Sequence, residues 1–399
     1  MIKGNIEAGN VNEFSNNHKT KLIAGEVYDN LPYLKKAHSY MTQGELEGKK
    51  YGKNYTVYIP DPGEVHDGLE AVPDAANEVE VEVTLQNKNT SIELDAWNKL
   101  NDIESFTNEI AKPRGVKLAR SIEKDAIDQT INKAFQVVAG SANFKTLTDM
   151  SKALDEVGVA GTKVTFVKPS VAGTIANQGL ANFIPSEIQT KIYKDNYLGQ
   201  YAGASIIEES LMPIVSVAGT ETATFAVKNV SGAAGTPDSA TVVGYEVTGF
   251  TGAAGVPFKL EGVKIVGVDG MQTDQDFYVI PDKDGNIPAV RIAIDGHNVN
   301  NANAWVETGA FTPSATLGVE SGKYALGQCR TEQAVGFDTY KFSDLPGSEN
   351  ETVTVNNVSL KMSTYGDGKN MTTLTRIDAP YAVTLPDPRQ AVVGFFKIG

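Results

Sequence analysis

Apolar residues recur every three or four positions between residues 101 and 139, and this period predicts one long helix with a polar opposite face. The apolar positions are Ile103, Phe106, Ile110, Val116, Ala119, Ile122, Ala126, Ile127, Ile131, Phe135 and Val138. Pro113 lacks an N–H and clashes with the preceding turn, so we expect it to start a second helix or to kink a single one. Gly140 and Ser141 are expected to end the helix. No residue on it has catalytic spacing, which favours a structural helix.

A long β-hairpin is predicted over residues 46–95, with its first strand at Tyr51–Ile59. In the second strand, Val79, Val81 and Val83 alternate with acidic residues, a pattern typical of a strand with one covered face. The loop between the strands is long and has little to bury, and such loops are usually functional or flexible. From Tyr55 to Gln86 there are eight acidic residues and no Lys or Arg.

Helices and strands alternate between residues 145 and 219, which predicts an α+β or α/β block. A capped amphipathic helix is expected from Thr146 or Thr148 to Gly158. A buried strand ending at Pro169 follows, then short helices at 170–180 and 185–195 and a glycine-punctuated strand at 198–210. Residues 1–45 have only weak helical spacing and predict an extended or partly helical arm.

Helical periodicity is lost after Ala218, and residues 220–330 alternate short strands with Gly, Asp and Asn turns. This pattern predicts a separate, autonomous β domain inserted into the first block. Its expected strands are 222–227, 240–247, 259–268, 276–280, 290–294 and 306–317. Four more strands, at 334–342, 353–366, 373–386 and 390–399, are expected to rejoin the sheets of the first block, with a hairpin turn at 365–371.

Charge and cysteine content narrow the function. The net charge of −14 argues against general nucleic-acid binding by phosphate neutralisation, although not against enclosing nucleic acid. The single Cys329 rules out an intrachain disulfide and a cysteine metal site, and it favours a reducing compartment. The first ten residues contain no apolar run, so no signal peptide is predicted. No stretch approaches 18 consecutive apolar residues, so no membrane-spanning helix is predicted.

Catalytic motifs are absent from the sequence. His18, His38, His66 and His297 are scattered, and neither HExxH, GxGxxG, GxxxxGK[ST] nor GxSxG occurs. Residues 282–286 resemble the start of a calcium loop, but Ala293 stands where the bidentate acid is needed. We therefore predict no catalytic residue, no metal site and no cofactor.

Five stretches of the sequence, taken in order, carry a resemblance to a known family. The first is VTLQNKNTSIELDAWNKLNDIESFTNEIAKPRGVKLARSIEKDA at 83–126. The others are LTDMSKALDEVGV with TKVTFVKPS at 147–170, LGQYAGASIIEESLMP at 198–213, FKLEGVKIVG at 258–267, and KMSTYGDGKNMTTLTRIDAPYAVTLPDPRQAVVGFF at 361–396. In this order they resemble the major capsid proteins of tailed bacteriophages with the Hong Kong 97-type fold, most of all the short-tailed (podovirus) coat proteins with an insertion domain.

The resemblance implies an α+β fold with an inserted all-β domain. It places an N-terminal arm at 1–45, the E-loop hairpin and P-domain strands at 46–95, and the P-domain spine helix at 96–144. It places the A-domain at 145–219, the insertion at 220–330, and closing strands of the A- and P-domains at 331–399.

The resemblance also implies a structural protein rather than an enzyme. Pentamers and hexamers of the chain would form an icosahedral shell around double-stranded DNA in the virion, after synthesis in the host cytoplasm. Scaffolding and portal proteins would be partners, a decoration protein would be a further one, and no membrane would be involved.

Two other classes of function stay open. One is a tail, fibre or surface-layer β protein, although a long helix and a β insertion inside an α/β block argue against it. The other is a carbohydrate-active enzyme with a β accessory domain, against which the lack of a catalytic constellation argues.

Opposite charges on the hairpin and the long helix give a candidate contact between subunits. The acidic residues are Asp61, Glu64, Asp67 and Glu70, with Asp74, Glu78, Glu80 and Glu82 beyond them, and the basic ones are Lys112, Arg114, Lys117, Arg120 and Lys124. At about 100° per residue, the last four basic residues fall on roughly a third of the helix surface. We hypothesise that the hairpin of one subunit lies across this stripe on its neighbour. The alternative is two solvated faces of opposite sign.

Overall fold

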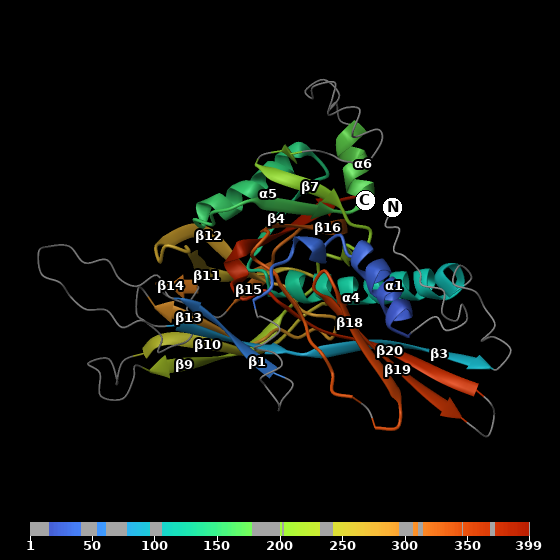
Figure 1. The fold of residues 1–399 in the computed structure, drawn as a ribbon. Helices are drawn as coiled ribbons and strands as arrows, with labels where there is room; N and C mark the ends of the chain where they lie inside the picture. The colour runs from blue at the N-terminus through green and yellow to red at the C-terminus, as the bar shows by residue number, and fades with distance from the viewer. Residues whose placement is uncertain are drawn as a thin grey trace, which may run out of the picture.

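The computed structural model describes residues 16–40, 54–60, 78–95, 106–177, 200–201, 203–231, 242–294, 306–309, 314–344, 346–367 and 372–398. Over these residues the protein is a mixed α and β structure, with four α-helices, three large β-sheets and one two-stranded sheet. In Figure 1 the first two of these helices lie over one large sheet, and the last two lie against a second one. The third large sheet lies to one side.

The predicted long helix is present as α4 (Lys112–Lys133), which continues directly from a π-helical turn at Phe106–Ala111. Pro113 lies in the first turn of α4, where its missing N–H has no partner to lose. The helix ends six residues before the expected end at 139, because Gln136–Ser141 forms strand β4. The predicted stop at Gly140 and Ser141 is therefore wrong. Phe135, Val137 and Val138 fit the helical period, but they suit a strand equally well.

The helix α1 (Asn16–Asp29) packs closely against α4. A Cβ atom added at Gly115 of α4 would lie only 2.7 Å from the Cβ of Glu26, so glycine is what allows this approach. After α1, the chain makes a short 3₁₀ helix, η1 (Leu34–Lys36), and enters the body of the protein. The described part of residues 1–45 is partly helical, as the sequence predicts, while its role as an arm stays a prediction.

A five-stranded sheet lies beneath α1 and α4 (Figure 1). It consists of β3 (Gln86–Asp95), β17 (Gly336–Thr339), β18 (Glu349–Val355), β19 (Val358–Asp367) and β20 (Thr372–Thr384). Strand β3 pairs with β20 over its whole length. The single strand expected at 353–366 is instead the end of β18, a turn and most of β19, because Asn356 and Asn357 have positive φ and reverse the chain.

The central sheet has seven strands, in the order β4, β21, β16, β5, β7, β6, with β8 alongside β16. The new members are β5 (Lys163–Val167), β6 (Gln200–Tyr201), β7 (Ala204–Glu208), β8 (Ile214–Val217), β16 (Gly322–Thr331) and β21 (Ala391–Lys397). The late strands thus rejoin the early ones, as the sequence predicts. β4 pairs with β21 in parallel.

Helices α5 (Phe144–Glu156) and α6 (Pro169–Asn177) lie beside the central sheet (Figure 1). The predicted start of α5 at a threonine is wrong, because the Asn143 side chain caps the helix by accepting the N–H of Thr146 at 3.0 Å. Gly158, with φ of +78°, ends it as expected. The helix expected at 185–195 lies outside the described residues.

The third sheet contains the inserted strands, in the order β12, β11, β14, β13, β10, β9, with β15 beside β11. They are β9 (Thr224–Ser231), β10 (Val242–Thr251), β11 (Phe258–Val266), β12 (Gln272–Val279), β13 (Val290–Ile294), β14 (Val306–Thr308) and β15 (Ala315–Leu317). The single strand expected at 306–317 is two short ones. The last strand of the inserted sheet ends at Leu317. The next strand, β16, lies between β5 and β21 and is buried on both faces, so it belongs to the central sheet instead.

The inserted sheet shares its apolar core with the rest of the protein. One contiguous cluster of buried residues runs from α1 and α4 into β10, β11 and β12. The rings of Phe135 and Phe277 lie 4.8 Å apart, and the N–H of Tyr278 donates to the carbonyl of Phe135 at 3.0 Å. The Arg389 guanidinium also donates to the carbonyl of Gly267 at 2.8 Å. Autonomous folding of residues 220–330 stays a prediction. An isolated fragment would lose these contacts with the rest of the protein.

The buried face of α4 predicts a large stability loss on truncation. Replacing Ile122 (1% exposed) by Ala should lower the free energy of unfolding by about 2–5 kcal/mol, because it opens a cavity in the shared core. Denaturant unfolding of the unassembled chain measures this. The neighbouring Ser121→Ala variant, on the exposed face, is the control and should change stability by less than about 0.5 kcal/mol. Equal effects of the two substitutions would contradict the burial of this face.

Candidate subunit interface

The predicted hairpin is present as β1 (Asn54–Pro60) and β2 (Glu78–Thr84), which pair antiparallel over seven residues. Tyr55, Val57 and Val83 are buried in a small cluster of their own with Ala382 of β20. This cluster is separate from the main core. Isolated two-stranded hairpins are marginally stable, so the hairpin depends on this narrow contact with the five-stranded sheet.

A polar anchor supplements the apolar cluster at the base of the hairpin. The Tyr55 hydroxyl donates to Asp338 Oδ2 at 2.8 Å, and the Ser39 hydroxyl donates to Asp338 Oδ1 at 2.7 Å. Burial and the nearby carboxylate of Asp338 raise the pKa of Tyr55, which therefore stays a donor across the physiological range. Asp338 thus ties the hairpin and the N-terminal segment to β17.

Three of the five predicted basic residues form an exposed stripe along α4. The side chains of Lys117, Arg120 and Lys124 are exposed, as the helical spacing predicts. Lys112 is exposed as well, and its ammonium donates to Asn108 Oδ1 at 3.1 Å. The buried face of α4 fixes the rotation of the helix, so this stripe points away from the sheet beneath.

Arg114, the remaining member of the predicted stripe, is bound within its own chain. Its Nη1 donates to Thr90 Oγ1 at 2.8 Å and to the carbonyl of Ser91 at 3.0 Å, both in β3. Its side chain is only partly exposed. Arg114 therefore fastens α4 to β3. Helical spacing alone does not show whether its side chain bonds to β3 or points outward.

The acidic half of the predicted contact lies mostly outside the described residues. Asp61, Glu64, Asp67 and Glu70 fall in the undescribed range 61–77. Glu80 and Glu82, on β2, are exposed. Contact between these acids and the stripe on α4 is therefore untested and stays a prediction.

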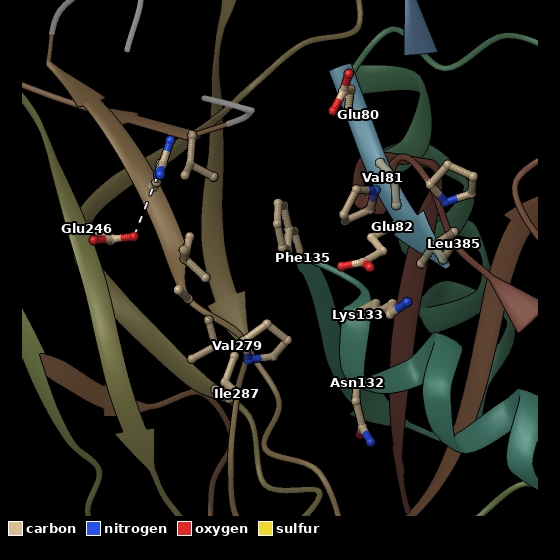
Figure 2. A pocket seen from close by; sticks show the side chains of 17 residues that line it. Glu80, Val81, Glu82, Asn132, Lys133, Phe135, Glu246, Val279, Ile287 and Leu385 are labelled. Carbon is tan, nitrogen blue, oxygen red and sulfur yellow. Dashed lines mark ion pairs between the residues drawn. The ribbon is translucent and has the colours of Figure 1, made fainter. Parts of the chain in front are cut away.

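A cleft of about 520 Å³ separates the hairpin from the inserted sheet (Figure 2). Val279 and Ile287 face Val81 and Phe135 across it, and Lys133 lies at the end of α4 on the same side as Phe135. Burial lowers the pKa of Lys133, whose ammonium has no hydrogen bond or ion pair within the described residues. The lining thus combines these apolar side chains with charged ones, among them Glu80 and Glu82 of β2 and the ion pair of Glu246 with Arg291.

A buried carboxyl lies beneath the stripe, and the helical pattern does not predict it. Glu123 is 1% exposed although its type predicts the polar face. Ala119 and Ile127, one turn away on either side, are both buried, and this apolar setting is the signal that could have found it. The anchor at Asp338 had no comparable signal, since 283 residues separate it from Tyr55.

No metal site is found in the described part of the chain. No three His, Cys, Asp or Glu side chains there are grouped so that they could hold a metal ion. His38 packs edge-on against the Tyr40 ring at 5.4 Å, and His66 and His297 fall outside the described ranges. Cys329 is buried and free. Among the described helices, none combines the length and apolar character needed to span a membrane.

The chain matches no protein-family profile and no curated protein. Solved phage structures are similar to it at low identity. A structure of Mycobacterium phage Che8 has 12% identity and a TM-score of 0.45, covering 90% of this chain and 89% of that one. The capsid of cyanophage P-SCSP1u has 9% identity and a TM-score of 0.46, covering 100% of this chain and 93% of that one.

The mature capsid of bacteriophage PhiM1 is similar at 10% identity and a TM-score of 0.45, covering 99% of this chain and 91% of that one. Every identity among these three is 12% or lower, and every TM-score is 0.46 or lower. These likenesses alone assign neither a fold nor a function to the chain.

The anchor of the hairpin can be tested by removing one hydroxyl. Tyr55→Phe should weaken the attachment of the hairpin by about 1–3 kcal/mol, because Asp338 loses a buried donor. Hydrogen exchange of the β1 and β2 amides measures the effect. Tyr58→Phe is the matched control, since Tyr58 lies on the same strand but is 55% exposed, and it should leave exchange unchanged. Equal exchange in the two variants would show that the hydroxyl has no anchoring role.

Proposed function

We propose that this protein is a major capsid subunit that assembles with copies of itself into a closed icosahedral shell around double-stranded DNA, as the head of a bacteriophage. The observation that carries the proposal is the β1–β2 hairpin. It has almost no core of its own, and its described residues meet the body through one small apolar cluster and the hydrogen bond from Tyr55 to Asp338. A hairpin of this kind gains stability when a neighbouring subunit covers it, and a shell supplies such neighbours.

The resemblance in sequence assigns a role to each part of the structure. The hairpin corresponds to the E-loop, α4 and the five-stranded sheet to the P-domain, and the central sheet with α5 and α6 to the A-domain. α1 belongs to the N-terminal arm, and the third sheet is the insertion domain. In this proposal the podovirus coat proteins are the nearest type.

The charged surfaces determine how neighbours meet. We propose that the acidic hairpin of one subunit, with Asp61, Glu64, Asp67 and Glu70, lies across Lys117, Arg120 and Lys124 on α4 of the next. Each exposed ion pair contributes only about 0–1 kcal/mol, so the contact guides register more than it supplies stability. Lys112 extends the stripe, while Arg114 positions the helix that carries it.

The remaining partners follow from this role. Pentamers and hexamers of the chain would form the shell, and scaffolding and portal proteins would direct its assembly, with a decoration protein as a further partner. The subunit would be made in the host cytoplasm and end in the virion. It would enclose DNA without sequence-specific contacts, which fits the net charge of −14. It would have no enzymatic activity.

Electron microscopy of the purified full-length chain distinguishes the proposed function from the two alternative classes of function. A capsid subunit should form closed shells of uniform diameter, because its contacts close by symmetry. Fibres or flat sheets would instead identify a tail, fibre or surface-layer protein. Small particles that never assemble, together with hydrolysis of a polysaccharide, would identify a carbohydrate-active enzyme.

Charge reversal tests the proposed contact between neighbours. Lys117→Glu with Lys124→Glu should slow assembly by about tenfold or more near 0.1 M salt, because it replaces attraction by repulsion without touching the core. Light scattering follows the rate, and circular dichroism checks that the subunit is folded.

Lys228→Glu with Lys323→Glu is the matched control. Both residues are exposed, the change in net charge is the same, and neither lies on α4. Reversing Glu64 and Asp67 to Lys in the stripe variant should restore part of the rate. Normal assembly of the stripe variant at every salt concentration would show that the hairpin docks elsewhere.

A further inference from the structure

Lys133 is the last residue of α4, and hydrogen bonds on either side fix its place in the backbone. The N–H of Ala134 donates to the carbonyl of Ile131 at 3.3 Å, and the carbonyl of Phe135 accepts the N–H of Tyr278 at 3.0 Å. These contacts hold Lys133 where the long helix meets the inserted sheet, on the wall of the cleft in Figure 2. Its side chain is half-buried and has no hydrogen bond or ion pair within the described residues.

Two other lysines are buried more deeply, and both are held as cations by their own chain. Lys163 is 6% exposed, and its ammonium pairs with the carboxylate of Asp155. Lys361 is 2% exposed, and its ammonium lies 3.2 Å from Asp344 Oδ1. Lys133 has no such partner in the described part of the chain, and burial lowers its pKa. Burial without a partner favours the neutral amine, which is the nucleophilic form of lysine.

The charged groups that line the cleft do not reverse this effect of burial. Glu80 and Glu82 of β2 favour the ammonium form, but both are exposed, so water screens their charges. Glu246 of β10 pairs with Arg291 of β13 at 3.7 Å, and the pair adds no net charge. The amine of Lys133 therefore loses its proton at a lower pH than an exposed lysine does.

Apolar walls stand beside this amine. Val81 and Phe135 lie on the side of the cleft that carries Lys133, and Val279 and Ile287 lie opposite (Figure 2). The volume of about 520 Å³ falls within the range typical of small-molecule sites. An apolar chain between these walls leaves water together with the wall surfaces, so its binding is favourable. The cleft thus places a neutral amine next to a site for an alkyl chain.

We propose that Lys133 is a site of covalent modification by apolar aldehydes, and that the cleft holds the alkyl chain of the aldehyde. The neutral Nζ attacks the carbonyl carbon, which forms a C–N bond. The nitrogen gives up its two protons to the carbonyl oxygen, which leaves as water, and a C=N bond remains. One amine and one aldehyde thus give one imine and one water, with no oxidant or reductant. The site does not depend on whether the chain forms shells.

Reductive labelling of the unassembled full chain tests the site. The chain is treated with limiting hexanal and cyanoborohydride, which reduces each imine to a stable secondary amine, and peptide mass spectrometry locates the labelled lysines. At neutral pH, Lys133 should react on the order of tenfold faster than the exposed Lys124 of the same helix, because it combines a neutral amine with apolar walls. Accessibility alone gives the opposite order. Equal or slower labelling of Lys133 would overturn the proposal.

Two other reagents show whether the walls of the cleft take part. Glycolaldehyde is small and polar, so it should favour Lys133 over Lys124 less than hexanal does. Hexan-1-ol is apolar but does not react with amines, so an excess should slow the hexanal labelling of Lys133 and leave that of Lys124 unchanged. Equal slowing at the two lysines, or none at either, would show that the alkyl chain has no site here and would overturn the proposal.

A substitution in the wall gives an independent check. Val81→Thr nearly keeps the shape of the side chain and should lower the hexanal labelling of Lys133 by about threefold, because its hydroxyl lies beside the alkyl chain. Glycolaldehyde labelling should stay the same. Thr84→Val, on the same strand but outside the cleft lining, is the matched control and should change neither rate. Equal effects of the two substitutions would contradict a role of the cleft. If Val81→Thr unfolds the hairpin, the hexan-1-ol competition on the unmodified chain decides.

Discussion

The burial of one face of α4 is the constraint on which the rest of the structure depends. Leu118, Ile122 and Ala126 must leave water, and the surfaces available to them are α1 and the five-stranded sheet. This contact fixes the rotation of the helix about its axis, and with it the direction of every other side chain on α4. The exposed cations and the buried Glu123 are both consequences of that rotation.

The elements that the sequence predicts well are those whose signal lies within a few residues. The period of α4, the alternation in β2 and the glycine after α5 are local patterns, and each has its expected element. The errors occur where a distant partner decides. Gln136–Ser141 is a strand because β21, more than 250 residues later, pairs with it. β16 belongs to the central sheet for the same kind of reason.

The candidate interface shows the same division. The spacing on α4 correctly places Lys117, Arg120 and Lys124 at the surface, because one helical face is a local property. It does not separate Arg114 from them, since only the position of β3 gives that guanidinium its acceptors. Tyr55 and Asp338 meet only in three dimensions. Pairing between distant strands and polar contacts between distant residues are not encoded in any local pattern.

The position of β21 in the central sheet has a consequence for synthesis on the ribosome. β21 lies between β4 and β16, so β4 has no strand beside it in the described structure until residues 391–397 have emerged. More than half of the chain, including the inserted sheet, is translated while that edge is open. Any product cut short before Ala391 lacks the strand that joins β4 to β16, so β4 has no place in the central sheet of such a product.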